Sequence, residues 1–130
     1  MINISEESIV LKLHHASLIV KDVSISLNFY QNILGLMVDE SRPDLGYPGA
    51  WLQLPGKQQI HLLQVENPDL KSERPEHGGR DHHIAFTVSS ITFLADSLEA
   101  LAIPFTKSKS GRKALFCRDP DGNALEFIEA

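Results

Sequence analysis

The sequence predicts an α+β fold built from two consecutive βαβββ modules. The first observation is a repeat: segments beginning at His15 and at His83 each contain a His, a Val five residues later, a short polar break and an amphipathic helical pattern. The second is that each half ends in an alternating apolar run, QIHLLQVE around His61 and NALEFIEA around Glu126. Self-similarity of this kind indicates a duplicated structural unit.

The first module is expected at residues 11–66. In the strand predicted over 13–20, Ala16 and Leu18 share one face, which leaves His15 and Ser17 on the other. A polar stop precedes a predicted helix that ends at Gly35. Its apolar stripe is Val23, Leu27, Tyr30 and Leu34, and three further strands are expected at 36–41, 50–54 and 59–65, the last after a Pro-Gly turn.

The second module is expected at residues 82–129. Its first strand has Ile84 and Phe86 on one face, so His83 lies on the other, in the same phase as His15. A helix with Leu94, Leu98 and Leu101 on one stripe follows, then strands at 105–107 and 113–117 and a DPDG turn at 119–122. In the last strand Glu126 points away from Leu125 and Phe127. Residues 67–81, polar and rich in Pro and Gly, are expected to form a linker or a lid.

Length and composition favour one domain over residues 1–130, since 42% hydrophobic residues can fill a core. The single Cys117 excludes an intramolecular disulfide framework and fits a reducing compartment. Neither a signal-peptide pattern nor a membrane-spanning stretch is present, so we expect a cytoplasmic protein. The net charge of −5 argues against a nucleic-acid partner, and no nucleotide-binding motif occurs.

The paired modules and two local motifs resemble the vicinal oxygen chelate (VOC) superfamily over residues 13–129. The motifs are the run from Val20 through Phe29-Tyr30 to Leu36 and the segment DPDGNALEF near the end. This superfamily includes glyoxalase I, fosfomycin-resistance and bleomycin-resistance proteins and extradiol dioxygenases. The resemblance implies that the two modules form a cup-shaped half-barrel, the glyoxalase-like fold.

The resemblance also implies a metal site with four ligands: His15, His61, His83 and Glu126. Imidazole and carboxylate donors suit Zn, Ni, Mn, Fe or Co, so the ligands predict one divalent ion per site without selecting the element. A register shift of one residue would place His14 and His82 on the site face instead.

The function that this resemblance implies is a glyoxalase-like metalloenzyme of the isomerase or lyase type. The ion would act as a Lewis acid on a small oxygenated, anionic substrate, and Glu126 would be the catalytic proton carrier. Two alternatives stay open. An extradiol dioxygenase would use Fe²⁺ held by His15, His83 and Glu126; a drug- or ligand-binding protein of the bleomycin-resistance type would need no metal.

Substrate contacts are expected from Arg74 and Arg80 in the linker, from Trp51, and from Phe116. The aromatic residue Tyr47 could line the mouth of the cup. Five further residues could hold an anion through a positive charge: His77, Lys107, Lys109, Arg112 and Lys113. Glyoxalase I typically has Arg and Asn at the positions of Ile19 and Val65, where they hold glutathione, so a glutathione adduct is disfavoured. By analogy, we expect a homodimer whose sites are shared between subunits.

Overall fold

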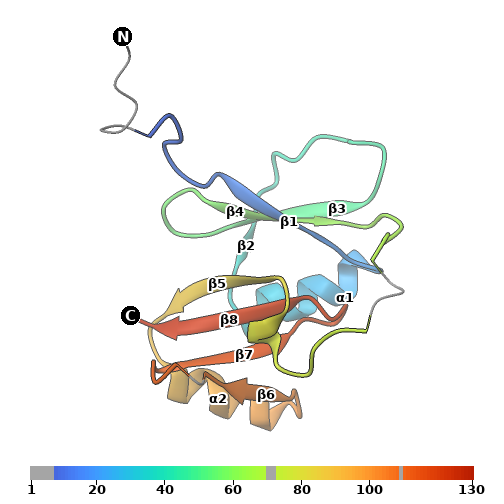
Figure 1. The fold of residues 1–130 in the computed structure, drawn as a ribbon. Coiled ribbons are helices and arrows are strands. Elements are labelled where there is room, and N and C mark those ends of the chain that lie inside the picture. The colour runs from blue at the N-terminus through green and yellow to red at the C-terminus, as the bar shows by residue number, and fades with distance from the viewer. Residues whose placement is uncertain (1–7, 70–72, 109) are drawn as a thin grey trace.

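Two four-stranded mixed sheets, one from each half of the chain, form the fold in the computed structural model (Figure 1). The structure describes residues 8–69, 73–108 and 110–130. The first half contains β1 (His15–Ile19), α1 (Val23–Leu27), η1 (Asn28–Ile33), β2 (Met37–Val38), β3 (Gly49–Gln53) and β4 (Gln59–Leu63). The second contains η2 (Gly78–Arg80), β5 (His83–Val88), α2 (Ile91–Ala100), β6 (Phe105–Lys107), β7 (Ala114–Arg118) and β8 (Ala124–Glu129).

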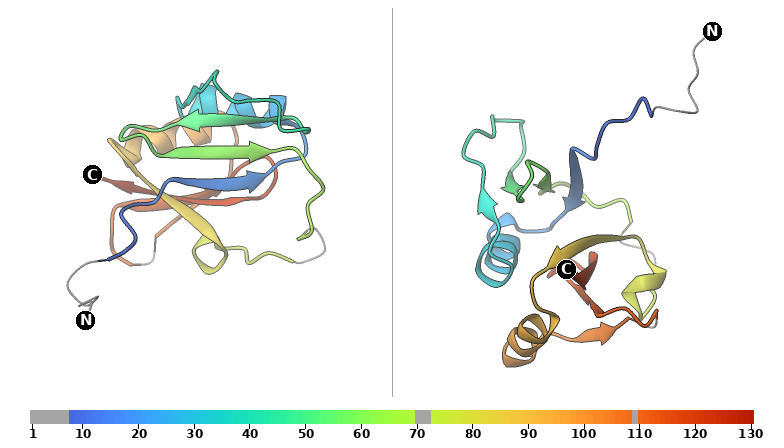
Figure 2. Two further views of the ribbon diagram at one scale, coloured as in Figure 1. Left: turned by 90° about the horizontal axis from the view of Figure 1, so that it is seen from above. Right: turned by 90° about the vertical axis from the view of Figure 1, so that its left-hand side faces the viewer.

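The strand order confirms the predicted duplication. The sheets run β1-β4-β3-β2 and β5-β8-β7-β6, and in each the first strand pairs in parallel with the last while the other pairs are antiparallel. The sheets are open, and α1 and α2 lie on the same side of the molecule (Figure 2, right). The predicted α+β class with two consecutive βαβββ modules is therefore correct.

Several element boundaries differ from the sequence predictions, and three of the differences have a local cause. The first helix continues as the π-helix η1, whose wider turns bring the neighbouring rings of Phe29 and Tyr30 into the core together. The strand predicted over 36–41 is only β2, because the Asp39 carboxylate accepts hydrogen bonds from Ser41 and turns the chain. Helix α2 ends at Ala100, so Leu101 is 55% exposed rather than buried.

One hydrophobic cluster contains residues of both modules. Its fully buried members include Tyr30, Leu52 and Leu62 from the first half and Leu98, Leu115 and Leu125 from the second. On the edge strands, Ala16, Leu18, Ile84 and Phe86 pack against this cluster. Because side chains alternate along a strand, His15 and His83 lie on the face of their sheet that is turned away from the core, as the sequence predicts.

The turn between β7 and β8 fastens the two modules together. The Tyr30 hydroxyl donates a 2.7 Å hydrogen bond to the buried Asp119 carboxylate. The Asn123 side chain donates to the Ile19 carbonyl at 3.2 Å, and the Lys21 amide donates to Asp121 at 2.9 Å. The turn is thus bonded both to the first helical segment and to the end of β1.

The thiol of Cys117 is free and lies in this shared core. Burial, together with the nearby Asp119 charge, raises its pKa to about 12, so the thiolate that would react is scarce at neutral pH.

Across the described ranges, no helix combines the length and the apolar character needed to cross a membrane.

Replacing Tyr30 by Phe should lower the free energy of unfolding by about 1–2 kcal/mol, because the buried Asp119 carboxylate loses a hydrogen-bond donor. Urea denaturation followed by circular dichroism measures this change. The matched control is Tyr47→Phe, since the Tyr47 hydroxyl makes no hydrogen bond within the described residues and its loss should leave stability nearly unchanged. Equal stability of the two variants would contradict the role assigned to the module contact.

Glu129 should make stability depend on pH. Its carboxylate accepts a 3.0 Å hydrogen bond from the Ile91 amide at the start of α2 and lies 3.3 Å from Lys113, and these contacts lower its pKa below 4.5. Because the folded pKa is depressed, the contribution is present above pH 4.5 and is lost as pH falls through the folded value. Thermal unfolding should show Glu129→Gln less stable than wild type at pH 7, with the gap closing towards pH 3. Glu99→Gln, an exposed helix position, should show no such gap.

Candidate metal centre

The first group of predicted site residues lies on the sheet β1-β4-β3-β2, on the face opposite the core. His15 comes from β1, His61 from β4 and Trp51 from β3. The His15 and His61 rings stack with centroids 3.9 Å apart, and the Trp51 ring stacks on His61 at 4.7 Å. We call these three residues the N-terminal half-site.

A chain of hydrogen bonds orients the His61 ring. Its Nε2 lies 2.8 Å from the Gln59 amide oxygen, and the Gln59 amide nitrogen donates to Asp39 at 2.9 Å. An amide oxygen only accepts, so Nε2 carries the proton and Nδ1 keeps its lone pair. Burial, followed by the nearby His15 and His14, lowers the His61 pKa. The ring is therefore held neutral, the form in which imidazole binds a metal ion.

The second group lies on the sheet β5-β8-β7-β6, again on the face opposite the core. His83 Nε2 is 3.1 Å from Glu126 Oε1, and Arg112 Nη2 is 3.0 Å from Glu126 Oε2. The Glu126 side chain is only 5% exposed, whereas Arg112 is 56% exposed. Together with Phe116, whose ring lies edge-on to His83, the residues His83 and Glu126 form what we call the C-terminal half-site.

The protonation pattern at His83 favours a cation at this half-site. His83 Nδ1 is 2.9 Å from the Asp81 carbonyl, which only accepts, so Nδ1 carries the proton. In the neutral ring Nε2 is then an acceptor facing Glu126 Oε1, another acceptor, and a proton or a metal ion must lie between them. Metal bonds of about 2.0–2.2 Å place adjacent donors about 3 Å apart, close to the separation found here.

The end of the linker packs beside the C-terminal half-site. The His77 ring lies 4.9 Å from Phe116, and Gly78 is buried. A β-carbon on Gly78 would lie 3.4 Å from the Ala124 β-carbon, in ordinary van der Waals contact, so this residue lies directly against β8. Residues 77–79 therefore form one wall of the half-site.

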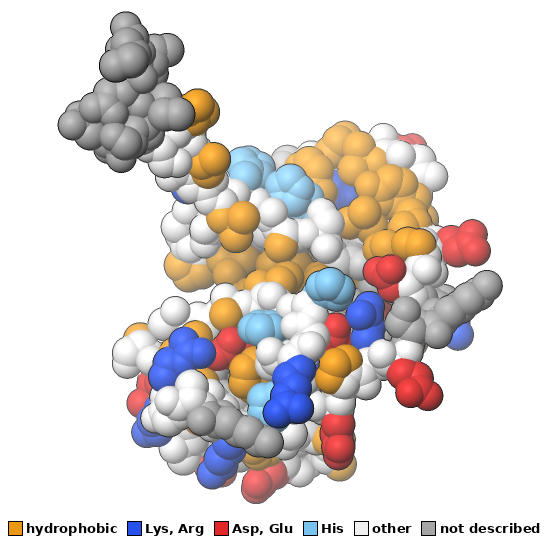
Figure 3. Space-filling view, in the orientation of Figure 1, with side chains coloured by type: hydrophobic (Ala, Val, Ile, Leu, Met, Phe, Trp, Pro, Cys, Tyr) orange, Lys and Arg blue, Asp and Glu red, His pale blue; other side chains and the backbone are white. Residues whose placement is uncertain are grey.

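The two half-sites are equivalent by register but separate within one chain. His15 pairs with Gln59, two residues before His61, and His83 pairs with Ala124, two residues before Glu126. Among the described residues, no three His, Cys, Asp or Glu side chains come close enough together to hold a metal ion. Figure 3 shows histidine side chains on the surfaces of both modules. One chain therefore supplies two pairs of candidate ligands rather than a set of four.

Comparison with known proteins identifies the family. Residues 12–127 match the model of the Glyoxalase/Bleomycin resistance protein/Dioxygenase superfamily. The chain belongs to this superfamily. It is 32% identical to Glyoxylase I 4 of Arabidopsis thaliana, over 88% of this chain and 68% of the relative. It is also 30% identical to the lactoylglutathione lyase of Haemophilus influenzae, over 88% and 90% of the two chains.

A solved structure with the same fold contains a metal ion. It is a mutant of the fosfomycin resistance protein FosX from Listeria monocytogenes, complexed with Mn(II) and 1S,2S-dihydroxypropylphosphonic acid. The TM-score is 0.73 with 19% identity, covering 94% of each chain. That protein holds a divalent ion on a chain that folds as this one does.

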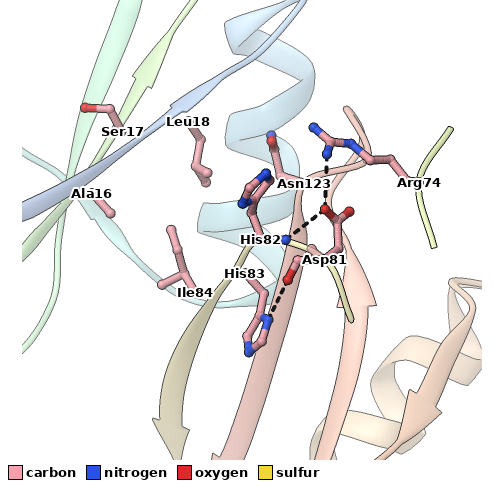
Figure 4. A pocket seen from close by; sticks show the side chains of 11 residues that line it. Ala16, Ser17, Leu18, Arg74, Asp81, His82, His83, Ile84 and Asn123 are labelled. Atoms are coloured by element: carbon pink, nitrogen blue, oxygen red, sulfur yellow. Dashed lines mark hydrogen bonds and ion pairs between the residues drawn. The ribbon is translucent and has the colours of Figure 1, made fainter. Parts of the chain in front are cut away.

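Several other described candidates lie outside the two half-sites, and Lys109 lies outside the described residues. Arg74 pairs with Asp81 at 3.1 Å beside a cleft of about 230 Å³ between β1 and the start of β5 (Figure 4). His82 lines the same cleft. Arg80 is exposed at the end of η2, and His14 contacts His15 through their Nδ1 atoms at 2.9 Å. Arg112, from the segment before β7, is the cation that reaches Glu126.

Sequence reasoning missed the residues that orient the histidines. Gln59 and Asp39 act on His61, and Asp81 acts on His83. Arg118 bonds to Asp81 and was also missed. Its signal was available, because alternation along β7 puts Arg118 on the same face as Phe116. The contact of Asp81 with His83 could not be predicted in this way, because it is made by the backbone carbonyl, which every residue type has.

Trp51 is the only tryptophan of the chain, so its fluorescence should report on His61. A protonated imidazole quenches indole emission more strongly than a neutral one. In chelator-treated protein, emission should fall as pH is lowered, with a midpoint below 6.5 because the His61 pKa is lowered. His61→Gln should abolish the transition and His77→Gln should preserve it. A midpoint at or above 6.5, or a transition that survives in His61→Gln, would contradict the stacked geometry.

Proposed function

We propose that the protein is a metal-dependent enzyme whose site forms between two subunits. The N-terminal half-site of one chain supplies His15 and His61, and the C-terminal half-site of the other supplies His83 and Glu126. The observation that carries this proposal is the separation of the candidate ligands into two pairs, each on a sheet face turned away from the core. A symmetric dimer brings such faces together twice and completes two sites.

The donors of both half-sites suit a divalent ion of the Zn, Ni, Mn, Fe or Co group. Two are imidazoles whose protonated nitrogen is already bonded to an oxygen, Gln59 for His61 and Asp81 for His83. Hydrogen bonds of this kind fix the tautomer of metal-bound histidines in general. Glu126 adds a negative charge that favours a cation.

The chemistry proposed is proton transfer of the isomerase or lyase type. A bound ion would supply Lewis acidity, stabilising negative charge on a substrate oxygen. Glu126 is the residue positioned to carry a proton: its Oε1 faces the half-site beside His83, and burial excludes water from it. Arg112 holds Oε2 and, being largely exposed, also offers N–H groups to an anionic substrate.

The substrate proposed is a small oxygenated anion. Phe116 and Trp51 present apolar ring surface on the two half-sites, and Arg112 presents a positive charge. Although one relative is named a lactoylglutathione lyase, Ile19 and Val65 offer no polar side chain at the positions where glyoxalase I typically holds glutathione. We therefore favour a substrate that lacks the glutathione moiety.

A mixed dimer tests the sharing of sites. Chains carrying His15→Ala and chains carrying His83→Ala, co-expressed with different affinity tags, give a purified heterodimer in which one site keeps all four ligands. Elemental analysis should then find about half of the wild-type metal content, while each variant homodimer holds almost none. If the ligands of each site came from one chain, the heterodimer would also be empty.

The control reverses the expectation. A wild-type chain paired with a chain carrying both substitutions has one lesion in each shared site, so this heterodimer should lose its metal. A heterodimer that kept half of the metal would contradict the proposal.

The metal found in the wild-type protein separates the alternative functions. Iron as the bound element would favour the extradiol dioxygenase, and a wild-type protein that binds no divalent ion under any loading condition would favour the ligand-binding alternative.

A further inference from the structure

Arg118 makes three short hydrogen bonds that converge on the approach to His83. Its Nη1 donates to the Gly122 carbonyl at 2.7 Å and to the Asp81 carboxylate at 2.8 Å, and its Nη2 donates to the Pro75 carbonyl at 2.6 Å. The side chain is 25% exposed. One planar, permanently charged group thus joins β7, the following turn and both ends of residues 75–81.

Asp81 connects Arg118 to His83, because its carboxylate bonds to the first and its carbonyl to the second. Its carboxylate accepts from Arg118, from Arg74 and from the His82 amide, and its side chain is 6% exposed. The carbonyl of the same residue accepts from His83 Nδ1 at 2.9 Å (Figure 4). With the carboxylate held on both sides, the carbonyl has little freedom to turn away from the ring.

The orientation of the ring decides which nitrogen meets Glu126. A fixed Asp81 carbonyl keeps a proton on Nδ1, so in the neutral ring Nε2, 3.1 Å from Glu126 Oε1, is the nitrogen with the lone pair that can bind an ion. If the carbonyl turned away, the proton would be free to move to Nε2, where it blocks a metal bond.

We propose that Arg118 is a positioning residue for the metal site: by clamping Pro75, Asp81 and Gly122 it keeps the Asp81 carbonyl on His83 Nδ1 and leaves His83 Nε2 free to bind the ion. Arg118 itself contacts neither His83 nor Glu126 through any hydrogen bond of the described residues. The proposal rests on the proposed function only in taking His83 as a ligand, since the hydrogen-bonded orientation of the ring can be measured without metal.

The chain offers a matched control. Arg74 also pairs with Asp81, at 3.1 Å, but it has no bond to Pro75 or to Gly122. Arg74→Met removes one positive charge and one Asp81 contact, as Arg118→Met does, yet leaves the clamp in place. Arg118→Lys keeps the charge, but an ammonium group cannot reproduce the planar fork that spans all three acceptors.

The experiment compares these variants by two measurements on the full chain. Long-range ¹H–¹⁵N correlation of chelator-treated protein, with His83→Gln to assign the signals, should show His83 protonated at Nδ1 in wild type and in Arg74→Met. Arg118→Met should show a mixture of tautomers, and Arg118→Lys a smaller change. Competition with a chromophoric chelator for Zn²⁺ should show affinity about 10–100-fold weaker in Arg118→Met and within about threefold of wild type in Arg74→Met.

Unchanged His83 tautomer in Arg118→Met would overturn the proposal, and so would equal effects of Arg118→Met and Arg74→Met. If Arg118→Met fails to fold, Arg118→Lys decides by the same two criteria. A wild-type protein that shows the Nδ1–H ring but binds no metal would contradict the proposed function while supporting the positioning role. A wild-type ring that is protonated at Nε2 and not at Nδ1 would contradict the positioning role directly.

Discussion

The shared hydrophobic core determines where every candidate ligand can lie. In a β-strand, successive side chains alternate between faces, so once Ala16, Leu18, Ile84 and Phe86 pack against the core, their neighbours must point the other way. The same core joins both modules, with Tyr30 and Asp119 bonded across it. The ligand faces of the two sheets are therefore turned away from the core by the packing that makes the chain stable. This is the physical reason why the site is proposed to need a second chain.

Much of this arrangement could be predicted because it depends on periodicity. The repeat beginning at His15 and His83 predicted the two modules, and the period of two along each strand predicted which residues share a face. The phase that selects His15 over His14 and His83 over His82 is set by apolar neighbours, and apolar neighbours are visible in the sequence. The duplication also predicts that His61 lies on the same sheet face as His15, and Glu126 on the same sheet face as His83.

What escaped prediction depends on local geometry that residue types do not encode. The π-helical turn at Asn28–Ile33 and the early end of β2 at Val38 result from how Phe29, Tyr30 and Asp39 pack or bond in three dimensions. Sites shared between subunits were expected only by analogy with the superfamily, because spacing along the chain says nothing about whether two sheets share a concave face.

In both half-sites an oxygen that accepts the ring proton orients the histidine, but the oxygen comes from a different part of the chain. At His61 the oxygen that accepts the ring proton belongs to a side chain, Gln59, which is itself held by Asp39. At His83 it belongs to the backbone of Asp81. A side chain can be exchanged by a single substitution, whereas a carbonyl can be moved only by moving its segment. For that reason the orientation of His83 depends on the segment that carries Asp81, and Arg118 bonds to the Asp81 carboxylate and to the carbonyls of Pro75 and Gly122.

The half-sites also differ in charge, and this difference gives each a separate part in the chemistry proposed. The described N-terminal half-site presents stacked rings, with His61 kept neutral by its lowered pKa, and carries no carboxylate. The C-terminal half-site carries the Glu126 carboxylate and the Arg112 guanidinium in contact. Imidazoles that bind an ion through their lone pairs are no longer available as bases, whereas the Glu126 carboxylate has two oxygens that can accept a proton. Proton transfer would therefore take place at the C-terminal half-site, with the anionic end of the substrate beside Arg112 and the N-terminal half-site acting as a ligand and an aromatic wall.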